Sequence, residues 1–132
     1  MNSAAKDIVS ILNGESSLGL TSGTDLFYSR MPDSPDKCVT CFDTPSRSPM
    51  MTYKQLTSKY YYSGVSVWAR DIAYDNAYST LQAILEFLHA NWNITVGSTY
   101  YALIKALNEP QVLNYDKNDR IIMMVNFDVQ RR

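Results

Sequence analysis

The residues best suited to chemistry are two cysteines in a C-x-x-C motif, Cys38-Val39-Thr40-Cys41. This spacing occurs in thiol redox centres and in zinc sites. A zinc site needs four ligands, whereas the chain has 2 cysteines and 1 histidine, His89. A redox pair of the thioredoxin type opens a helix, but this pair lies within a predicted strand, where its side chains point to opposite faces. We therefore interpret both cysteines as small, half-buried residues of a hairpin.

The remaining candidates for chemistry are the histidine and three carboxylates. His89 falls near the end of a predicted helix, where positive charge is favourable, and only Glu86 lies at helical spacing from it. Asp116, Asp119 and Asp128 lack the ligand offsets and final glutamate of a calcium loop, so a turn is indicated instead. The sequence contains neither a nucleophile elbow nor a glycine-rich phosphate loop. We therefore predict a protein that is not an enzyme, with no catalytic, cofactor-binding or metal-binding residues.

Tyrosine is abundant, with 10 residues, and several of them are adjacent in Tyr60–Tyr62 and Tyr100–Tyr101. Tyrosine is enriched where proteins meet, because its ring is apolar and its hydroxyl can face water. One face of the sheet could therefore serve a partner subunit. Alternatively, the central helix covers one face and the remaining rings lie half-buried at the surface.

Composition places the chain among ordinary globular proteins. Its 132 residues predict one domain, residues 1–132, with 45% hydrophobic and 19% charged residues. A net charge of −1 argues against non-specific nucleic-acid binding, which needs a basic surface. No apolar run approaches the roughly 20 residues of a membrane span, so we expect no membrane partner. Met1–Asp7 lacks the pattern of a signal peptide, so we expect the protein to remain in the cytoplasm where it is made.

The element expected to organise these residues is a central helix, Asp75–Trp92. Its apolar residues recur at the spacing of one helical face, and Asp75 can cap the first turn by accepting from free amides. An apolar stripe of this width needs a partner surface, which the flanking strands would supply. A short first helix is predicted at Ala4–Asn13, ended by Gly14, because glycine tolerates a positive φ.

The first predicted strands are Thr24–Met31 and Lys37–Asp43, joined as a hairpin by the turn at Pro32–Asp36. Tyr60–Arg70 is a third strand. Its apolar residues do not alternate strictly, so we expect a bulge near Ser63-Gly64, since glycine within a strand often marks one.

The C-terminal part predicts the rest of the sheet. Thr99–Leu107 is apolar on both faces and is placed in the middle of the sheet. Arg120–Val129 alternates strictly, with its odd-numbered apolar residues facing inward. Asn108–Asn118 is expected to be a loop, and Met50–Ser58 is ambiguous. The result is an α+β fold of two layers, a mostly antiparallel sheet packed against a central helix, with a short N-terminal helix.

Several segments resemble a known family. The matching runs are Asp25–Pro32, Pro35–Pro45, Val65–Asp71, Tyr74–Ala77 and Asp116–Arg131. Pro35–Pro45 corresponds to a P-D-x-C-V-x-x-x-D-T hairpin in phage minor capsid proteins. From about Asp7 to Arg132 the chain is similar to tail terminator (tail completion) proteins of long-tailed bacteriophages. Ser46 and Ser48 depart from the glycine- or proline-rich turn that is common there.

This resemblance implies a hexameric ring that caps the head-proximal end of the tail tube, stops its polymerisation and docks on the head. The implied partners are copies of the chain, the tail tube protein and a head-completion or connector protein. Genomic DNA would pass through the lumen without specific binding. The implied location is the head–tail junction of the virion, after assembly in the host cytoplasm. A head-completion or connector adaptor of the phage neck is the alternative.

A ring subunit makes a head-to-tail contact, so it needs two different adhesive surfaces. The long loops Thr44–Ser58 and Asn108–Asn118 are candidates to reach a neighbour or to line the channel, because loops on a rigid sheet often carry function. The carboxylate-bearing turn Asp116–Asp119 is expected near the lumen or the tube contact.

Overall fold

The structure, a computed structural model, describes residues 1–49 and 60–132. Its helices are α1 (Ala4–Asn13), a short 3-10 helix (Ser16–Leu18) and α2 (Tyr74–Leu88). Its strands are β1 (Leu26–Tyr28), β2 (Cys38–Thr44), β3 (Tyr61–Asp71), β4 (Ile94–Val96), β5 (Thr99–Ala106), β6 (Gln111–Tyr115) and β7 (Ile121–Arg131). The ambiguous segment Met50–Ser58 lies outside the described residues.

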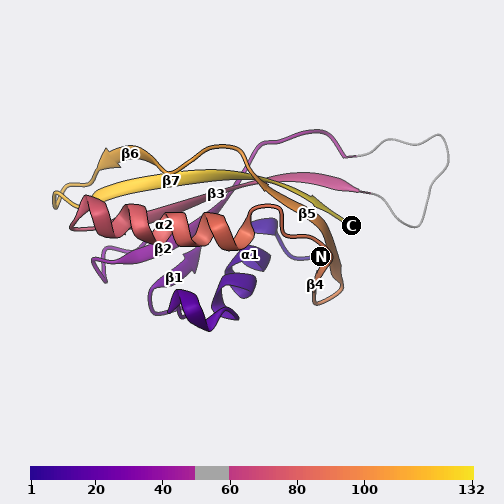
Figure 1. Cartoon of the computed structure of the whole chain (residues 1–132), viewed down its shortest axis with the longest axis horizontal. Helices are drawn as coiled ribbons and strands as arrows, with labels where there is room; N and C mark the ends of the chain where they lie inside the picture. Colours follow the sequence, from indigo (N-terminus) through magenta and orange to yellow (C-terminus); the bar gives the residue numbers. More distant parts are fainter. Residues whose placement is uncertain (50–59) are drawn as a thin grey trace.

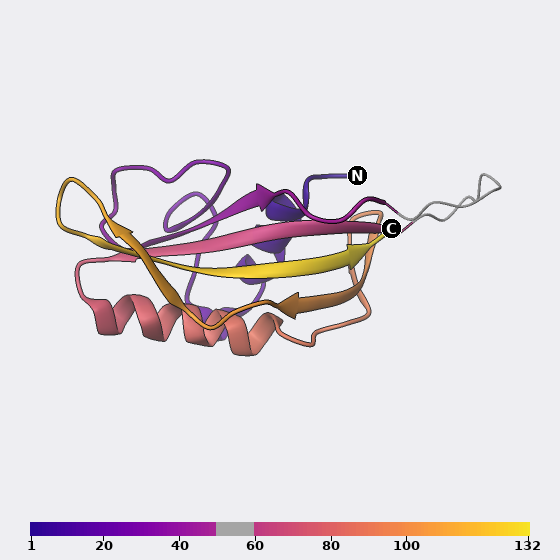
Figure 2. The ribbon, with the colours of Figure 1, turned by 90° about the horizontal axis from the view of Figure 1, so that it is seen from above.

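All seven strands form one sheet in the order β1-β2-β3-β7-β5-β4, and β6 pairs with β7 beyond the end of β5. Every pairing is antiparallel except that of β1 with β2. Figures 1 and 2 show α2 lying along one face of this twisted sheet. The predicted α+β fold of two layers is therefore confirmed.

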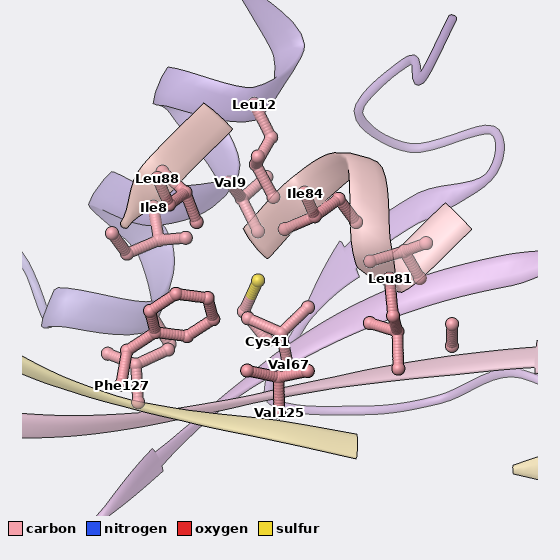
Figure 3. Close-up of a cluster of buried hydrophobic side chains, with 14 of the residues drawn as sticks. Ile8, Val9, Leu12, Cys41, Val67, Leu81, Ile84, Leu88, Val125 and Phe127 are labelled. Carbon is pink, nitrogen blue, oxygen red and sulfur yellow. The ribbon is translucent and has the colours of Figure 1, made fainter. Parts of the chain in front are cut away.

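The long strand β7 lies at the centre of the sheet and follows its predicted alternation. Its inward residues are all almost fully buried: Ile121, Met123, Val125, Phe127 and Val129. They meet the inward side chains of β3 and β2 and the apolar faces of both helices, and Ile8 and Leu88 lie near Phe127 (Figure 3). The strict alternation of apolar residues sets the register of β7 in the sheet, because one face of the strand must be buried.

The predicted bounds of α1 are confirmed, and Ser3 caps it by accepting from the Lys6 amide at 3.3 Å. The expected positive φ at Gly14 is wrong, since Gly14 has φ −76°. The prediction for the central helix was too long, since α2 ends at Leu88 instead of Trp92. After it, Ala90 donates to the Ile104 carbonyl and Ile104 donates to the Asn91 carbonyl, each at 2.9 Å. Pairing with β5 thus replaces the next helical hydrogen bonds.

Asp75 does not cap the central helix, because the N-cap position is Ala73, which makes no side-chain capping bond. Asp75 instead lies in the first helical turn, where a negative charge is favourable. The carboxylate that accepts from free amides just before the helix is that of Asp71, at 2.7 Å from the Ile72 nitrogen and 3.3 Å from that of Ala73.

The predicted hairpin of the first two strands is wrong, because β1 and β2 run parallel. The connection between them is not a tight turn. It is held at the end of the sheet, where Arg70 donates to the carbonyls of Pro35 at 2.7 Å and Asp36 at 3.3 Å. Arg120 also donates to the Asp33 carbonyl. Two buried guanidinium groups thereby bind the connection just before β2 starts. These contacts join residues distant in sequence, so a local turn pattern does not reveal them.

The bulge predicted at Ser63-Gly64 is also wrong, since β3 pairs with β7 without a register shift. The irregularity is in β5, between Tyr101 and Leu103. Gly64 is required for a different reason: a Cβ atom there would lie 2.9 Å from the Thr44 carbonyl oxygen. Glycine permits the close approach of β2 where that strand ends.

Two strands went unpredicted, β4 and β6. The predicted loop Asn108–Asn118 contains β6, although all five residues of β6 are exposed. Between β5 and β6 the Asn108 side chain replaces a backbone partner, with Oδ1 accepting from the Asn126 amide at 2.8 Å. The prediction that Thr99–Leu107 lies inside the sheet is confirmed, because β5 has β7 on one side and β4 on the other.

Candidate assembly surfaces

The two cysteines are free and completely buried, more so than the half-buried state predicted. Cys41 belongs to the helix-facing core, and Cys38 points to the opposite face of β2. Burial raises the pKa of both thiols, and the Asp43 carboxylate adds to the increase for Cys41. Both therefore remain protonated at neutral pH, which disfavours thiolate chemistry and metal binding.

His89 has a structural partner. It is exposed just after α2, and its Nδ1 accepts a hydrogen bond from the Ala106 amide at 3.0 Å. Glu86, the only acid at helical spacing, accepts instead from Gln82 Nε2 at 3.2 Å. The imidazole thus ties the end of α2 to the end of β5.

The three candidate carboxylates do not meet. Asp116 organises its own turn, accepting from the amides of Asn118 at 2.9 Å and Arg120 at 3.0 Å. Desolvation raises the pKa of Asp116, but these amide hydrogen bonds and the Arg120 guanidinium outweigh it and lower the pKa overall. Asp128 lies on β7 and pairs with Arg47 at 2.9 Å. Within residues 1–49 and 60–132, no three His, Cys, Asp or Glu side chains form a group that could hold a metal ion.

Arg120 is the centre of an ionic cluster at one end of the sheet. Its side chain is only 4% exposed and pairs with Asp116 at 2.8 Å and with Asp36 at 3.1 Å. Lys117 approaches Asp33 at 3.8 Å. Since Asp33 and Asp36 remain largely exposed, this end presents carboxylates to solvent above a buried guanidinium.

A second buried network lies toward the other end of the sheet. The Tyr101 hydroxyl donates to Asp7 Oδ2 at 2.6 Å, and Arg131 Nη1 lies 3.9 Å from the same oxygen. Arg131 also donates from Nε to Ser63 Oγ at 3.1 Å. Burial, followed by the Asp7 carboxylate, raises the pKa of Tyr101. The network joins α1 to β3, β5 and β7, and sequence reasoning missed it because its members are distant in the chain.

The tyrosines divide between core and surface. Tyr101 is fully buried. Arg132 lies over the rings of Tyr60 at 5.5 Å and Tyr100 at 5.0 Å, and Arg47 lies over the Tyr62 ring at 4.2 Å. Both arginines thus contact rings of their own chain. A role of these rings in a partner contact stays a prediction.

Two apolar surfaces stand at opposite edges of the sheet, β6 at one and β1 at the other (Figure 1). The first is the β6 ridge, formed by Val112, Leu113 and Tyr115, which are 48%, 37% and 61% exposed. The second is the β1 pocket, a surface hollow of about 380 Å³ lined by Ser22, Gly23, Leu26, Phe27, Tyr28, Arg30 and Pro32. The first surface is an exposed strand, and the second is a hollow.

The buried ionisable groups of this chain act on the chain itself, fastening turns, a loop and a helix to the sheet. Among the described residues, these contacts have the character of a structural protein. The family profile described as "Bacteriophage tail terminator protein" matches residues 15–131. The chain therefore belongs to the bacteriophage tail terminator family and is a tail-related structural protein of the virion. The resemblance predicted from the sequence is confirmed.

Solved structures share the fold. A chain from the "Virion of native gene transfer agent (GTA) particle" aligns with a TM-score of 0.70 at 12% identity, over 97% of this chain and 93% of that one. A second solved structure aligns with a TM-score of 0.55 at 8% identity, over 98% of this chain and 97% of that one. No curated protein matches the sequence. Among the described helices, none is long and apolar enough to cross a membrane.

Proposed function

We propose that this chain forms a ring, hexameric by family resemblance, that caps the head-proximal end of the tail tube. The cap ends polymerisation of the tube protein and offers its other side to the head connector. The observation that carries this proposal is the family match over residues 15–131. The structural support is a sheet whose buried polar groups bond within the same chain. The edges and loops of the sheet are therefore the parts available for contacts with other subunits.

The ring position explains the charge of the chain. Packaged DNA must pass the head–tail junction, and a strongly basic lumen would retain it. A net charge of −1 avoids this difficulty. The protein therefore acts by geometry at this junction, with no chemical step and no specific recognition of DNA.

The end of the sheet that carries Asp33, Asp36 and the Asp116–Asp119 turn is proposed to face the tube or the lumen. The carboxylates of Asp33 and Asp36 are largely exposed, while Arg120 pairs with Asp36 and donates to the Asp33 carbonyl. Charge reversal by Asp33→Lys should therefore leave the fold intact and weaken capping. Unchanged capping by this variant would exclude the acidic end from the tube contact.

The test of the function is the length of tail tubes. The tube protein of the same phage is polymerised with and without the purified chain, and tube lengths are measured by negative-stain electron microscopy. We expect shorter tubes with one ring at a single end. Tubes of unchanged length would contradict capping. A ring of twelve subunits bound to isolated connectors, and never to tubes, would favour the connector adaptor instead.

A further inference from the structure

We propose that neighbouring copies of this chain meet head to tail, with the β6 ridge of one copy seated in the β1 pocket of the next. This inference rests on the proposed ring and identifies which surfaces would build it. A head-to-tail contact joins two different surfaces, and it closes into a ring when the rotation per subunit allows. The β6 ridge and the β1 pocket are such a pair.

The β6 ridge is exposed in a way that the fold of one chain does not explain. All five residues of β6 are exposed, and β7 is the only described strand that pairs with β6. An apolar edge strand without lysine or proline is a template for association, which monomeric proteins normally avoid. The ridge therefore calls for a partner surface.

The β1 pocket has a suitable chemistry. Phe27, Tyr28 and Pro32 supply its exposed apolar surface, since Leu26 is fully buried, so the pocket suits leucine, valine or tyrosine side chains. The backbone edge of β1 is already occupied, because Leu26 exchanges hydrogen bonds with the turn before it. The partner is therefore bound by side-chain insertion and not by an added strand.

Strand register places the two surfaces at one level of the sheet. Strand pairing joins the residues of one row in the order Leu26, Val39, Ala69, Met123 and Val112. A second copy placed beside the first, with its strands in the same direction, brings its Val112 level with Leu26 of the neighbour. In this row, four strand spacings separate Val112 from Leu26 within one chain, about 19 Å.

Charge favours the same orientation. The exposed charged residues that flank β6 in sequence are Glu109, Lys117 and Asp119, so acids outnumber bases there by two to one. Arg30 lines the β1 pocket, and Lys6 reaches its edge, with Nζ 6.0 Å from the centre of the Tyr28 ring. Opposite charges at the rim orient two copies and speed their encounter, while the apolar centre supplies most of the affinity.

Engineered cysteines test the contact directly. Ser22→Cys marks the pocket and Leu113→Cys marks the ridge, while the native thiols are buried and should not react. Under mild oxidation we expect the double variant to form a ladder of covalent oligomers that ends at one closed species. Each single variant should remain free of this ladder. If the double variant forms no more covalent oligomer than the single variants do, the proposal is wrong.

Mixing variants tests whether the contact joins two different surfaces. Leu113→Asp disrupts the β6 ridge and leaves the β1 pocket unchanged. Arg30→Glu disrupts the β1 pocket and leaves the β6 ridge unchanged. Each variant alone should assemble at least tenfold more weakly than the wild type in native mass spectrometry. An equimolar mixture should form dimers that grow no further, since one good contact remains. Trp92→Asp is the matched control, because Trp92 is 67% exposed, falls between α2 and β4, and belongs to neither surface.

Failure of this contact and failure of the proposed function give different results. If Leu113→Asp and Arg30→Glu still form rings that limit tube length, the contact is wrong and the function stands. If the cysteine ladder forms but the rings do not limit tube length, the contact stands and the function is wrong.

Discussion

Strands β6 and β7 pair with each other, yet they differ in how far their side chains are buried. Every second side chain of β7 is buried against the helices, whereas all five residues of β6 are exposed. The position of β7 is fixed by its own chain, and the apolar residues of β6 have no equivalent partner among the described residues. The difference separates residues that serve folding from residues available for assembly.

The largest effect on stability is expected from β7. Phe127→Ala removes a ring that is 1% exposed and leaves a cavity in the shared core of both helices and the sheet. The free energy of unfolding should fall by about 3–5 kcal/mol. Urea denaturation followed by circular dichroism measures this. A loss below about 1 kcal/mol would mean that the core closes around the missing ring and that β7 is not its centre.

The second effect concerns the buried network between α1 and β5. Tyr101→Phe removes the hydroxyl that donates to Asp7 and leaves a buried carboxylate short of a donor. Asp7 Oδ1 already lacks a hydrogen-bond partner among the described residues. We expect a loss of about 1–3 kcal/mol in unfolding free energy.

A double-mutant cycle with Asp7→Asn gives the energy of that pair. The coupling should be favourable, because the two residues share one hydrogen bond. Additive effects of the two substitutions would show that Tyr101 contributes through packing alone.

The contrast between β7 and β6 also explains what the sequence could predict. Local sequence patterns were sufficient to predict the elements that bury one face. These were β7 by its alternation, α2 by its apolar stripe, and α1, which ends before Gly14. Distant contacts decided the rest. The connection between β1 and β2 is held by Arg70, at least 34 residues away from the loop atoms it binds, and by Arg120, at least 84 residues away. The end of α2 depends on pairing with Ile104.

The candidate surfaces were predicted only in outline. The need for two different adhesive surfaces followed from ring geometry, and the loop Asn108–Asn118 was identified as one candidate. The strand within that loop was missed because its residues do not alternate between a dry and a wet face. The β1 pocket is formed by residues from a turn, a strand and a connection, so no periodic pattern marks it.

A smaller effect is expected at the turn between β6 and β7. The folded-state pKa of Asp116 lies below its ordinary value of 3.8, so its charged form stabilises the fold. That contribution is complete above the unfolded-state pKa and is lost as pH falls through the folded-state pKa. Asp116→Asn should therefore lower Tm at pH 7 and cease to matter in strong acid. A Tm difference that is the same at pH 7 and pH 2 would contradict a role for the charge.

The smallest effect on folding, and the sharpest contrast with β7, is expected in β6 itself. Leu113→Ser should change the free energy of unfolding by no more than about 0.5 kcal/mol, as is usual for an exposed site. The same substitution should weaken self-association, because it removes part of the β6 ridge without adding charge. Urea denaturation and native mass spectrometry on one preparation give both quantities. If Leu113→Ser destabilised the monomer as much as Phe127→Ala does, β6 would belong to the fold, and its exposed apolar residues would no longer indicate an assembly surface.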